Sequence, residues 1–181
     1  ATEKYLKAIK FDKKNFNAYF NIGTLYKLEN KIDKAEEYLS EAIKLNPYFV
    51  GAYNNLFEIF DRSNQIEKFE KLLNISKVNL KNKTFINFFS GVLEYKKKNY
   101  ENVIKIYEEI NLNENDIGHQ IACNELLAKS YDFVHNYGKA FEIFQNSNNQ
   151  IYKIYKNKYN KDNYIQLINK RSDYFTKKNV R

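Results

Sequence analysis

The sequence predicts an all-α fold, and three features support that prediction. Glycine occurs five times and proline once among 181 residues, whereas all-β chains need turn residues at frequent intervals. Apolar residues make up 43% of the chain, which is enough for a packed core. They recur at i, i+3, i+4 and i+7, the spacing of amphipathic helices. The sequence contains no run of about 18 apolar residues that would span a membrane.

A repeat of 34 residues organises the predicted helices, and its cleanest copy is Asn21 to Pro47, NIGTLYKLENKIDKAEEYLSEAIKLNP. A shift of 34 residues carries the small and aromatic positions of this copy onto equivalent positions, and the phase holds without a gap. The aligned positions are Tyr19, Gly23, Tyr26, Ala35, Leu39 and Ala42, then Tyr53, Phe57, Phe60, Phe69, Leu73 and Ser76, then Asn87, Gly91, Glu94, Val103, Tyr107 and Ile110.

This period, with small and aromatic residues at these offsets, resembles the tetratricopeptide repeat (TPR). The resemblance implies a solenoid of helical hairpins wound into a right-handed superhelix. One hairpin cannot bury its apolar face, so at least about three must stack. The predicted units are the second helix of a partial repeat at 1–15, a full repeat at 16–49, degenerate repeats at 50–83, 84–117 and 118–150, and basic capping or linker helices at 151–181.

Local signals indicate where these units begin and end. Pro47 closes the first full repeat, because proline disfavours a helical conformation in the residue before it. The fourth repeat starts three residues late, and the polar segment 111–119 accounts for the shift. We expect a longer connection there, with Asp116 as a helix N-cap. After Phe144 the pattern becomes polar, and we expect helices within 151–181 to cap the array.

The net charge of +8 is concentrated at the C-terminal end. Residues 151–181 hold nine Lys or Arg and two Asp, so this segment carries 9 − 2 = +7. One interpretation is a codon bias that also raises Asn, Ile, Tyr and Phe. The other is binding of nucleic acid or an acidic surface. Nucleic acid is the minor alternative, because the basic groups are mostly lysine and base readout favours arginine.

The sequence contains no recognisable catalytic or metal-binding motif. His119 and His135 are the only histidines and Cys123 is the only cysteine, so no cluster has the spacing of metal ligands and no internal disulfide can form. Phosphate-binding glycine loops, nucleophile elbows and zinc-protease motifs are also absent. We therefore expect a chain that is not an enzyme and needs no cofactor or metal.

The TPR resemblance implies that the first helix of each unit lines a concave groove for a peptide or partner domain. Asn21 and Asn55 lie one repeat apart, and in TPR proteins that hold extended peptides such asparagines hydrogen-bond the ligand backbone. The third unit presents an apolar face, which a partner or the capping helices would cover. The predicted contacts are Asn17, Phe20, Asn21, Thr24 and Lys27, then Asn54, Asn55 and Glu58, then Phe85, Phe88, Phe89, Val92 and Tyr95.

One familiar TPR mechanism does not fit these residues. Chaperone-binding TPR domains hold a C-terminal carboxylate with lysine, asparagine and arginine side chains on the groove face. The matching positions here are Phe20 and Thr24, then Asn55, then Phe85 and Phe89, and only Asn55 agrees. A carboxylate clamp needs cations, so we expect no such clamp.

A second resemblance concerns Tyr131 to Asn148, YDFVHNYGKAFEIFQNSN. Tyr131-Asp132, Tyr137, Ala140-Phe141 and Asn148 are similar to the last repeat of bacterial proteins that join a TPR array to a sulfotransferase domain. This resemblance implies a substrate-docking arm whose catalytic domain lies beyond residue 181. The first hypothesis is a non-catalytic protein-interaction module.

The compartment of the protein is not encoded in a recognisable signal. The chain starts inside a repeat unit and contains no methionine, so we expect the natural N-terminus to lie upstream and the chain to be a piece of a longer protein. The single cysteine gives no indication of an oxidising compartment, and a cytoplasmic location is favoured. The exposed ends of a repeat array also predict self-association.

Overall fold

We analysed a computed structural model of the chain, which describes residues 2–110 and 117–156. Within those ranges the chain forms nine helices and no strand, so the all-α prediction is confirmed. The chain divides into two compact units, Ala1–Asn113 and Glu114–Arg181, and each is considered by itself. The expected N-cap at Asp116 and the expected capping helices and basic groups after Lys156 lie outside the described residues.

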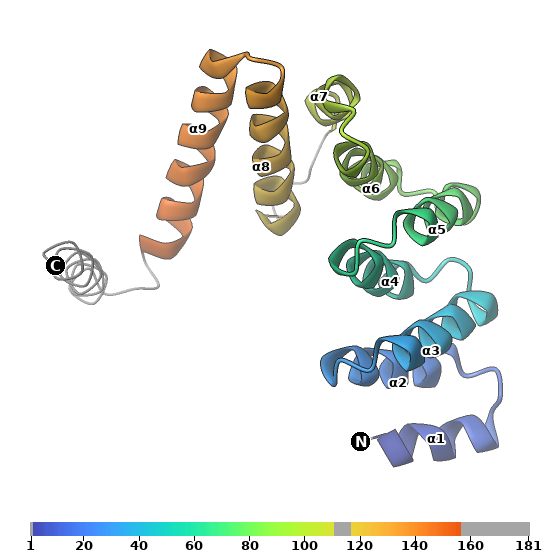
Figure 1. The fold of residues 1–181 in the computed structure, drawn as a ribbon. Coiled ribbons are helices and arrows are strands. Elements are labelled where there is room, and N and C mark those ends of the chain that lie inside the picture. The colour runs from blue at the N-terminus through green and yellow to red at the C-terminus, as the bar shows by residue number, and fades with distance from the viewer. Residues whose placement is uncertain (1, 111–116, 157–181) are drawn as a thin grey trace, which may run out of the picture. The chain divides into compact units, whose positions relative to one another are not determined.

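The helices follow one another as antiparallel hairpins (Figure 1). Several of the helices show one apolar face and one polar face in their sequence, among them those at 32–45, 50–62 and 100–108. The first unit comprises α1 (Thr2–Phe11), α2 (Phe16–Leu28), α3 (Ile32–Leu45), α4 (Val50–Arg62), α5 (Ile66–Asn79), α6 (Lys83–Lys96) and α7 (Tyr100–Glu108), and the second comprises α8 (Ile117–Phe133) and α9 (Tyr137–Lys156).

The turn within each hairpin has the same construction. One residue adopts a left-handed backbone with φ near +60°, namely Asn30, Asn64, Lys98 or His135. The N–H of the residue after it donates to a carbonyl five residues back, as in the 2.8 Å bond from Lys31 N to Tyr26 O, which satisfies a carbonyl left open at the helix end. These turns are spaced 34, 34 and 37 residues apart, which is the three-residue shift seen in the sequence.

Small residues allow close helix packing in two of the hairpins. A Cβ added to Gly23 of α2 would lie 2.7 Å from Leu39 Cγ of α3, and one added to Gly91 of α6 would lie 2.1 Å from Tyr107 Cε1 of α7. Ala35 of α3 is completely buried. The helices of these two hairpins therefore approach as closely as the side chains allow.

The α4–α5 hairpin is built differently. Phe57 and Phe69 stand where the first repeat has Gly23 and Ala35, and both rings are fully buried. The Phe57 ring lies 4.8 Å from Phe69 and stacks 4.0 Å from Phe89 of α6. Two large rings prevent the close approach seen between α2 and α3, so the space between the helices is filled by aromatic packing.

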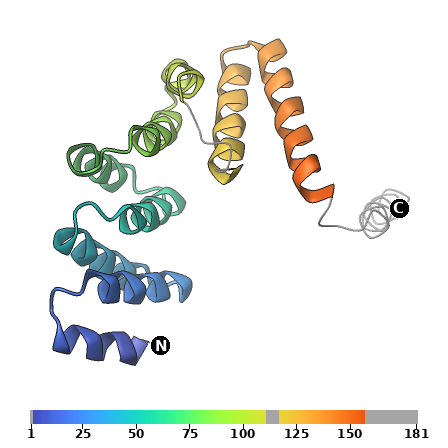
Figure 2. The same cartoon turned by 180° about the vertical axis from the view of Figure 1, so that it is seen from behind.

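Consecutive hairpins of the first unit stack on one another, as the two opposite views show (Figures 1 and 2). The second helix of each hairpin packs against the first helix of the next, α3 on α4 and α5 on α6. The first helices α2, α4 and α6 therefore follow one another along the unit. This arrangement places α2 beside α4 and creates a continuous face across both.

The second unit is a single long hairpin. Leu127, Ala128 and Tyr131 of α8 and Ala140 of α9 are buried in it. Among the helices that the structure describes, none has both the length and the apolar character required to cross a membrane.

Candidate binding groove

The candidate site is the outward face of α2 and α4. In α2 the buried residues are Ala18, Ile22 and Gly23, so helical spacing turns Asn17 away from the buried side and places Asn21 at its edge. In α4 the buried face contains Ala52, Tyr53 and Leu56, among others, and Asn54 and Glu58 point away from it. Asn17 and Glu58 are exposed, whereas Asn21 and Asn54 are half-buried.

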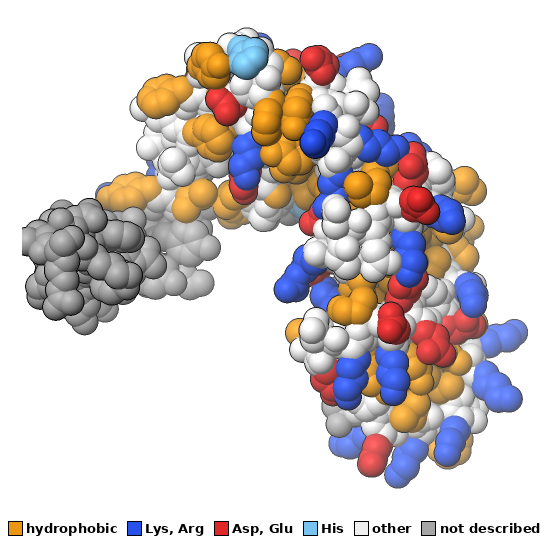
Figure 3. Space-filling view, in the orientation of Figure 1, with side chains coloured by type: hydrophobic (Ala, Val, Ile, Leu, Met, Phe, Trp, Pro, Cys, Tyr) orange, Lys and Arg blue, Asp and Glu red, His pale blue; other side chains and the backbone are white. Residues whose placement is uncertain are grey.

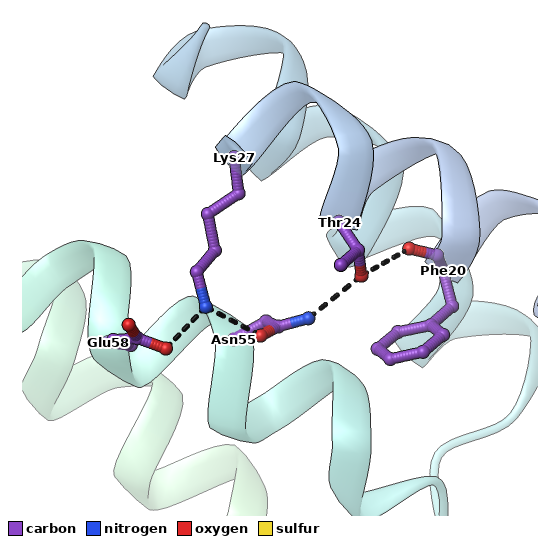
Figure 4. Close-up of polar contacts among 5 residues, drawn as sticks. All are labelled: Phe20, Thr24, Lys27, Asn55 and Glu58. Atoms are coloured by element: carbon purple, nitrogen blue, oxygen red, sulfur yellow. Dashed lines mark hydrogen bonds and ion pairs between the residues drawn. The ribbon is translucent and has the colours of Figure 1, made fainter. Parts of the chain in front are cut away.

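A chain of polar contacts joins α2 to α4 across this face (Figure 4). Thr24 Oγ1 donates to Phe20 O at 2.9 Å, and Asn55 Nδ2 donates to Thr24 Oγ1 at 2.9 Å. Lys27 Nζ donates to Asn55 Oδ1 at 2.7 Å and forms an ion pair with Glu58. The network restrains the side chains of Thr24, Lys27, Asn55 and Glu58, because each of them contacts at least one other member.

The two asparagines that are equivalent in the sequence therefore differ in their surroundings. Asn55 uses its carbonyl oxygen and one amide hydrogen to connect α2 and α4. Its residual capacity toward a ligand is one amide hydrogen. Asn21, one repeat earlier, lies half-buried on α2 outside this network. In the structure Asn55 therefore connects α4 to α2. A ligand-binding role for Asn21 stays a prediction.

The other side of α4 is tied to α6 in the same way. Lys96 Nζ lies 2.8 Å from Asp61 Oδ1 and donates to Asp61 O at 3.0 Å. The side chains of Lys27 and Lys96 are only 15% and 17% exposed. Both lysines are already paired with carboxylates of α4, so neither is available to hold the carboxylate of a ligand.

An aromatic cluster closes the end of the face formed by the N-termini of α2 and α4. The Phe49 ring lies 5.1 Å from the Phe16 ring and 4.9 Å, edge-on, from the Phe20 ring. A Cβ on Gly51 would lie 3.1 Å from Phe49 Cζ and 3.4 Å from Phe20 Cζ, so the glycine leaves room for both rings. All three rings are half-buried and offer an apolar surface beside Asn17.

Phe20 was predicted from the sequence as a groove contact, whereas Phe16 and Phe49 were not. The i, i+4 spacing of Phe16 and Phe20 was an available signal, because it places both rings on one side of α2. Phe49 directly precedes α4, and the direction of its side chain depends on the backbone of the turn. That direction was not readable from helical periodicity.

The aromatic residues predicted for the third unit lie mostly inside the structure. Phe85, Phe88 and Phe89 are buried, whereas Val92 and Tyr95 are half-buried. The three phenylalanine rings do not form an open groove wall in this structure. Their part in binding a partner stays a prediction.

The rings are buried because neighbouring aromatic side chains surround them. Phe89 stacks on Phe57, and Phe88 packs edge-on against Phe89 at 4.9 Å. Phe85 lies 6.0 Å from Phe57. The expectation that a partner or the capping helices would cover this apolar face overlooked the interior contacts that Phe57 provides.

Within residues 2–110 and 117–156, no group of three or more His, Cys, Asp or Glu side chains could hold a metal ion. Cys123 is buried in α8. His135 Nδ1 lies 2.7 Å from the Tyr137 hydroxyl at the turn between α8 and α9. The contact between His135 and Tyr137 is local to the hairpin.

Comparison with known families identifies the repeat. The family model described as "Tetratricopeptide repeat" matches residues 16–49. Those residues are a tetratricopeptide repeat, and the chain has the TPR fold. The α2–α3 hairpin is the matched TPR unit.

Solved structures agree with this fold. The structure described as "YrrB: a TPR protein with an unusual peptide-binding site" has a TM-score of 0.55, 15% identity, and coverage of 81% of this chain and 92% of that chain. The structure of MamA has a TM-score of 0.61, 17% identity, and coverage of 87% of this chain and 90% of that chain. No curated protein matches the chain.

The TPR fold supports a protein-interaction module, because stacked hairpins create an extended binding surface. The similarity of residues 131–148 to sulfotransferase-linked repeats is not addressed by these comparisons and stays a prediction.

Proposed function

We propose that the chain is a non-catalytic interaction module that binds an extended peptide segment of a partner protein across α2 and α4. The observation that carries the proposal is the combination of half-buried amides and an aromatic cluster on one face. That face is held in place by the contacts among Lys27, Asn55 and Glu58. The YrrB structure, described as having a peptide-binding site, has the same fold and supports this choice of ligand.

The amides suit a peptide because each one offers both a donor and an acceptor. Asn17, Asn21 and Asn54 lie on the outward face of the two helices, and a peptide backbone presents alternating N–H and C=O groups. Such contacts hold the backbone of the ligand independently of its side chains. The half-buried rings of Phe16, Phe20 and Phe49 add an apolar surface for one ligand side chain.

The polar network contributes by fixing the groove before the ligand arrives. Because Lys27 joins Asn55 and Glu58, α2 and α4 are held at one separation in the free protein. A face that is already ordered loses less conformational entropy on binding than one that orders with its ligand. The paired lysines also mean that selection of an acidic C-terminus is not expected.

A random peptide library displayed on phage and selected against the full chain tests the proposal. Affinities of the enriched peptides are then measured by fluorescence anisotropy with three proteins: wild type, the double variant Asn21→Ala with Asn54→Ala, and the control Asn74→Ala. Asn74 is exposed on α5, away from the α2–α4 face. Each lost hydrogen bond weakens binding by about 0.5–1.5 kcal/mol, so the double variant should bind about tenfold more weakly.

Two results contradict this function. If the library yields no peptide that binds the full chain, the proposed peptide-binding function is wrong. Equal binding of the enriched peptides to the wild type and the double variant would place their site elsewhere on the molecule. The control Asn74→Ala should bind as tightly as the wild type.

A further inference from the structure

Arg62, the last residue of α4, carries a positive charge that is not paired within the described part of the chain. Its side chain is exposed, and no ion pair or hydrogen bond joins it to a side chain of residues 2–110 or 117–156. The two carboxylates next to it on α4 are already engaged, Glu58 with Lys27 and Asp61 with Lys96. The charge left over at this end of the α2–α4 face is therefore positive.

Basic and acidic side chains are close to balanced over the helices of the first unit. Figure 3 shows the two kinds interspersed on the surface of these helices. Residues 16–110 hold 14 Lys or Arg and 13 Asp or Glu, which gives a net charge of 14 − 13 = +1. So small a net charge attracts neither acidic nor basic ligands over a long range. Selection by charge on the α2–α4 face therefore depends on individual unpaired groups, and Arg62 is such a group.

Arg62 continues a stripe of α4 that belongs to the proposed binding face. The spacing is four, three and four residues along Gly51, Asn55, Glu58 and Arg62, which places these positions on one side of the helix. The rings of the aromatic cluster contact the Gly51 end, and the contacts to Lys27 lie in the middle. A ligand that follows this stripe meets an apolar surface at one end and an unpaired guanidinium at the other.

We propose that the α2–α4 face selects an acidic peptide, in which an Asp or Glu side chain binds Arg62. The inference rests on the proposed peptide-binding function. The planar fork of a guanidinium matches the two oxygens of a carboxylate. Gly51 and Arg62 are eleven positions apart, which is about 16 Å along a helix. An extended peptide covers about 3.3 Å per residue, so the acidic residue should lie about five positions from the apolar residue that contacts the aromatic cluster.

Two other roles of Arg62 make different predictions. A clamp for a C-terminal carboxylate needs several cations, and Lys27 and Lys96 are paired, so the expected contact is with a side chain of the peptide. Arg62 also lies in the last turn of α4, where a cation interacts favourably with the helix dipole. That structural role predicts a loss of stability when Arg62 is replaced, but no change in the preference for an acidic ligand.

Peptides enriched on the full chain from the random phage library supply the probes. Each is compared with a copy in which Asn replaces its Asp, or Gln its Glu, and affinities are measured by fluorescence anisotropy. The wild type should bind the amide copy about fivefold more weakly, as expected for an exposed charge pair. Arg62→Gln should bind both copies equally. Arg62→Lys should retain part of the preference, because the charge remains and the fork is lost.

Lys71→Gln is the matched control, because it removes an exposed positive charge from α5. This variant should keep the full preference for the acidic copy. The preference of the wild type should also decrease at about 0.5 M salt, since salt screens exposed charge pairs. Urea unfolding followed by circular dichroism verifies that each variant is folded and measures any loss of helix stability separately from the change in ligand preference.

Two results overturn the role of Arg62 and leave the proposed function in place. One is a set of enriched peptides that depend on Asn21 and Asn54 but contain no acidic residue at a constant distance from an apolar one. The other is an equal preference for the acidic copy in the wild type and in Arg62→Gln, which would place the carboxylate at a different cation. A chain that binds no peptide at all would overturn the proposed function and this inference together.

Discussion

Replacement of Gly91 by alanine should destabilise the first unit, because α6 and α7 leave no room for a methyl group there. The new Cβ would lie 2.1 Å from Tyr107 Cε1, 2.3 Å from Cζ and 2.7 Å from the hydroxyl oxygen. The Tyr107 ring is buried, and its hydroxyl donates to Phe88 O at 2.9 Å. The ring must therefore move as a whole, and the hydrogen bond is lost with it.

The size of the effect follows from three contributions. Overpacking of a buried site costs about 1–3 kcal/mol, and loss of the hydrogen bond from Tyr107 to Phe88 costs about 1 kcal/mol. Alanine in place of glycine favours the helical state by about 1 kcal/mol. The sum is a loss of about 2 kcal/mol in the free energy of unfolding. With a urea dependence of about 2 kcal/mol per molar, the midpoint of unfolding should fall by about 1 M.

Urea unfolding followed by circular dichroism measures this loss, and Gly138→Ala is the matched control. A Cβ on Gly138 would meet nothing within 4 Å, so that variant should be as stable as the wild type or slightly more stable. In a Tyr107→Ala background the ring is absent, and Gly91→Ala should then cost nothing. A midpoint for Gly91→Ala equal to that of the wild type, or the same loss in both backgrounds, would refute the packing argument.

Two further predictions concern helix caps and acid stability. The side chains of Asn15 and Asn82 each accept a hydrogen bond from the backbone N–H three residues ahead, so alanine at either position should lower the free energy of unfolding by about 1 kcal/mol; unchanged urea midpoints would contradict this. Burial raises the pKa of Glu94, but amide donors of Asn102 and Asn99 and two nearby lysines outweigh burial and lower it below its ordinary value of 4.5. The stability that ionised Glu94 gains from these contacts is present above pH 4.5 and is lost as the pH falls through the lowered pKa. The free energy of unfolding should therefore fall less between pH 7 and pH 3 in Glu94→Gln than in the wild type. An equal fall in both proteins would contradict the assignment.

The all-α fold and the phase of the 34-residue repeat could be predicted from the sequence, because both depend on the spacing of residues close together in the chain. Gly23 and Gly91 mark the tight helix crossings at the predicted offset. The three-residue shift before the fourth repeat appears in the structure as the wider spacing between the turns at Lys98 and His135. These features repeat along the chain, so a single sequence is sufficient to detect them.

The contacts of the site could not be predicted, because they join residues from different repeats. Helical spacing placed Asn21 and Asn55 on equivalent faces, but their roles depend on the residues opposite them. Asn55 of α4 contacts Thr24 and Lys27 of α2. The partner of Lys27 on α4 is Glu58, and a periodic pattern contains no information on which charges pair across helices.

The aromatic residues of the third repeat show that the same helix position can be exposed in one repeat and buried in another. Gly23 permits close packing in the first repeat, whereas Phe57 at the equivalent position fills the gap between α4 and α5 and reaches Phe89 of α6. The position of Phe89 is that of Asn21 and Asn55 in the earlier repeats. The position that is half-buried on α2 therefore becomes core on α6. The peptide contacts proposed for Asn21 and Asn54 therefore have no counterpart at Phe89, and the proposed site uses α2 and α4.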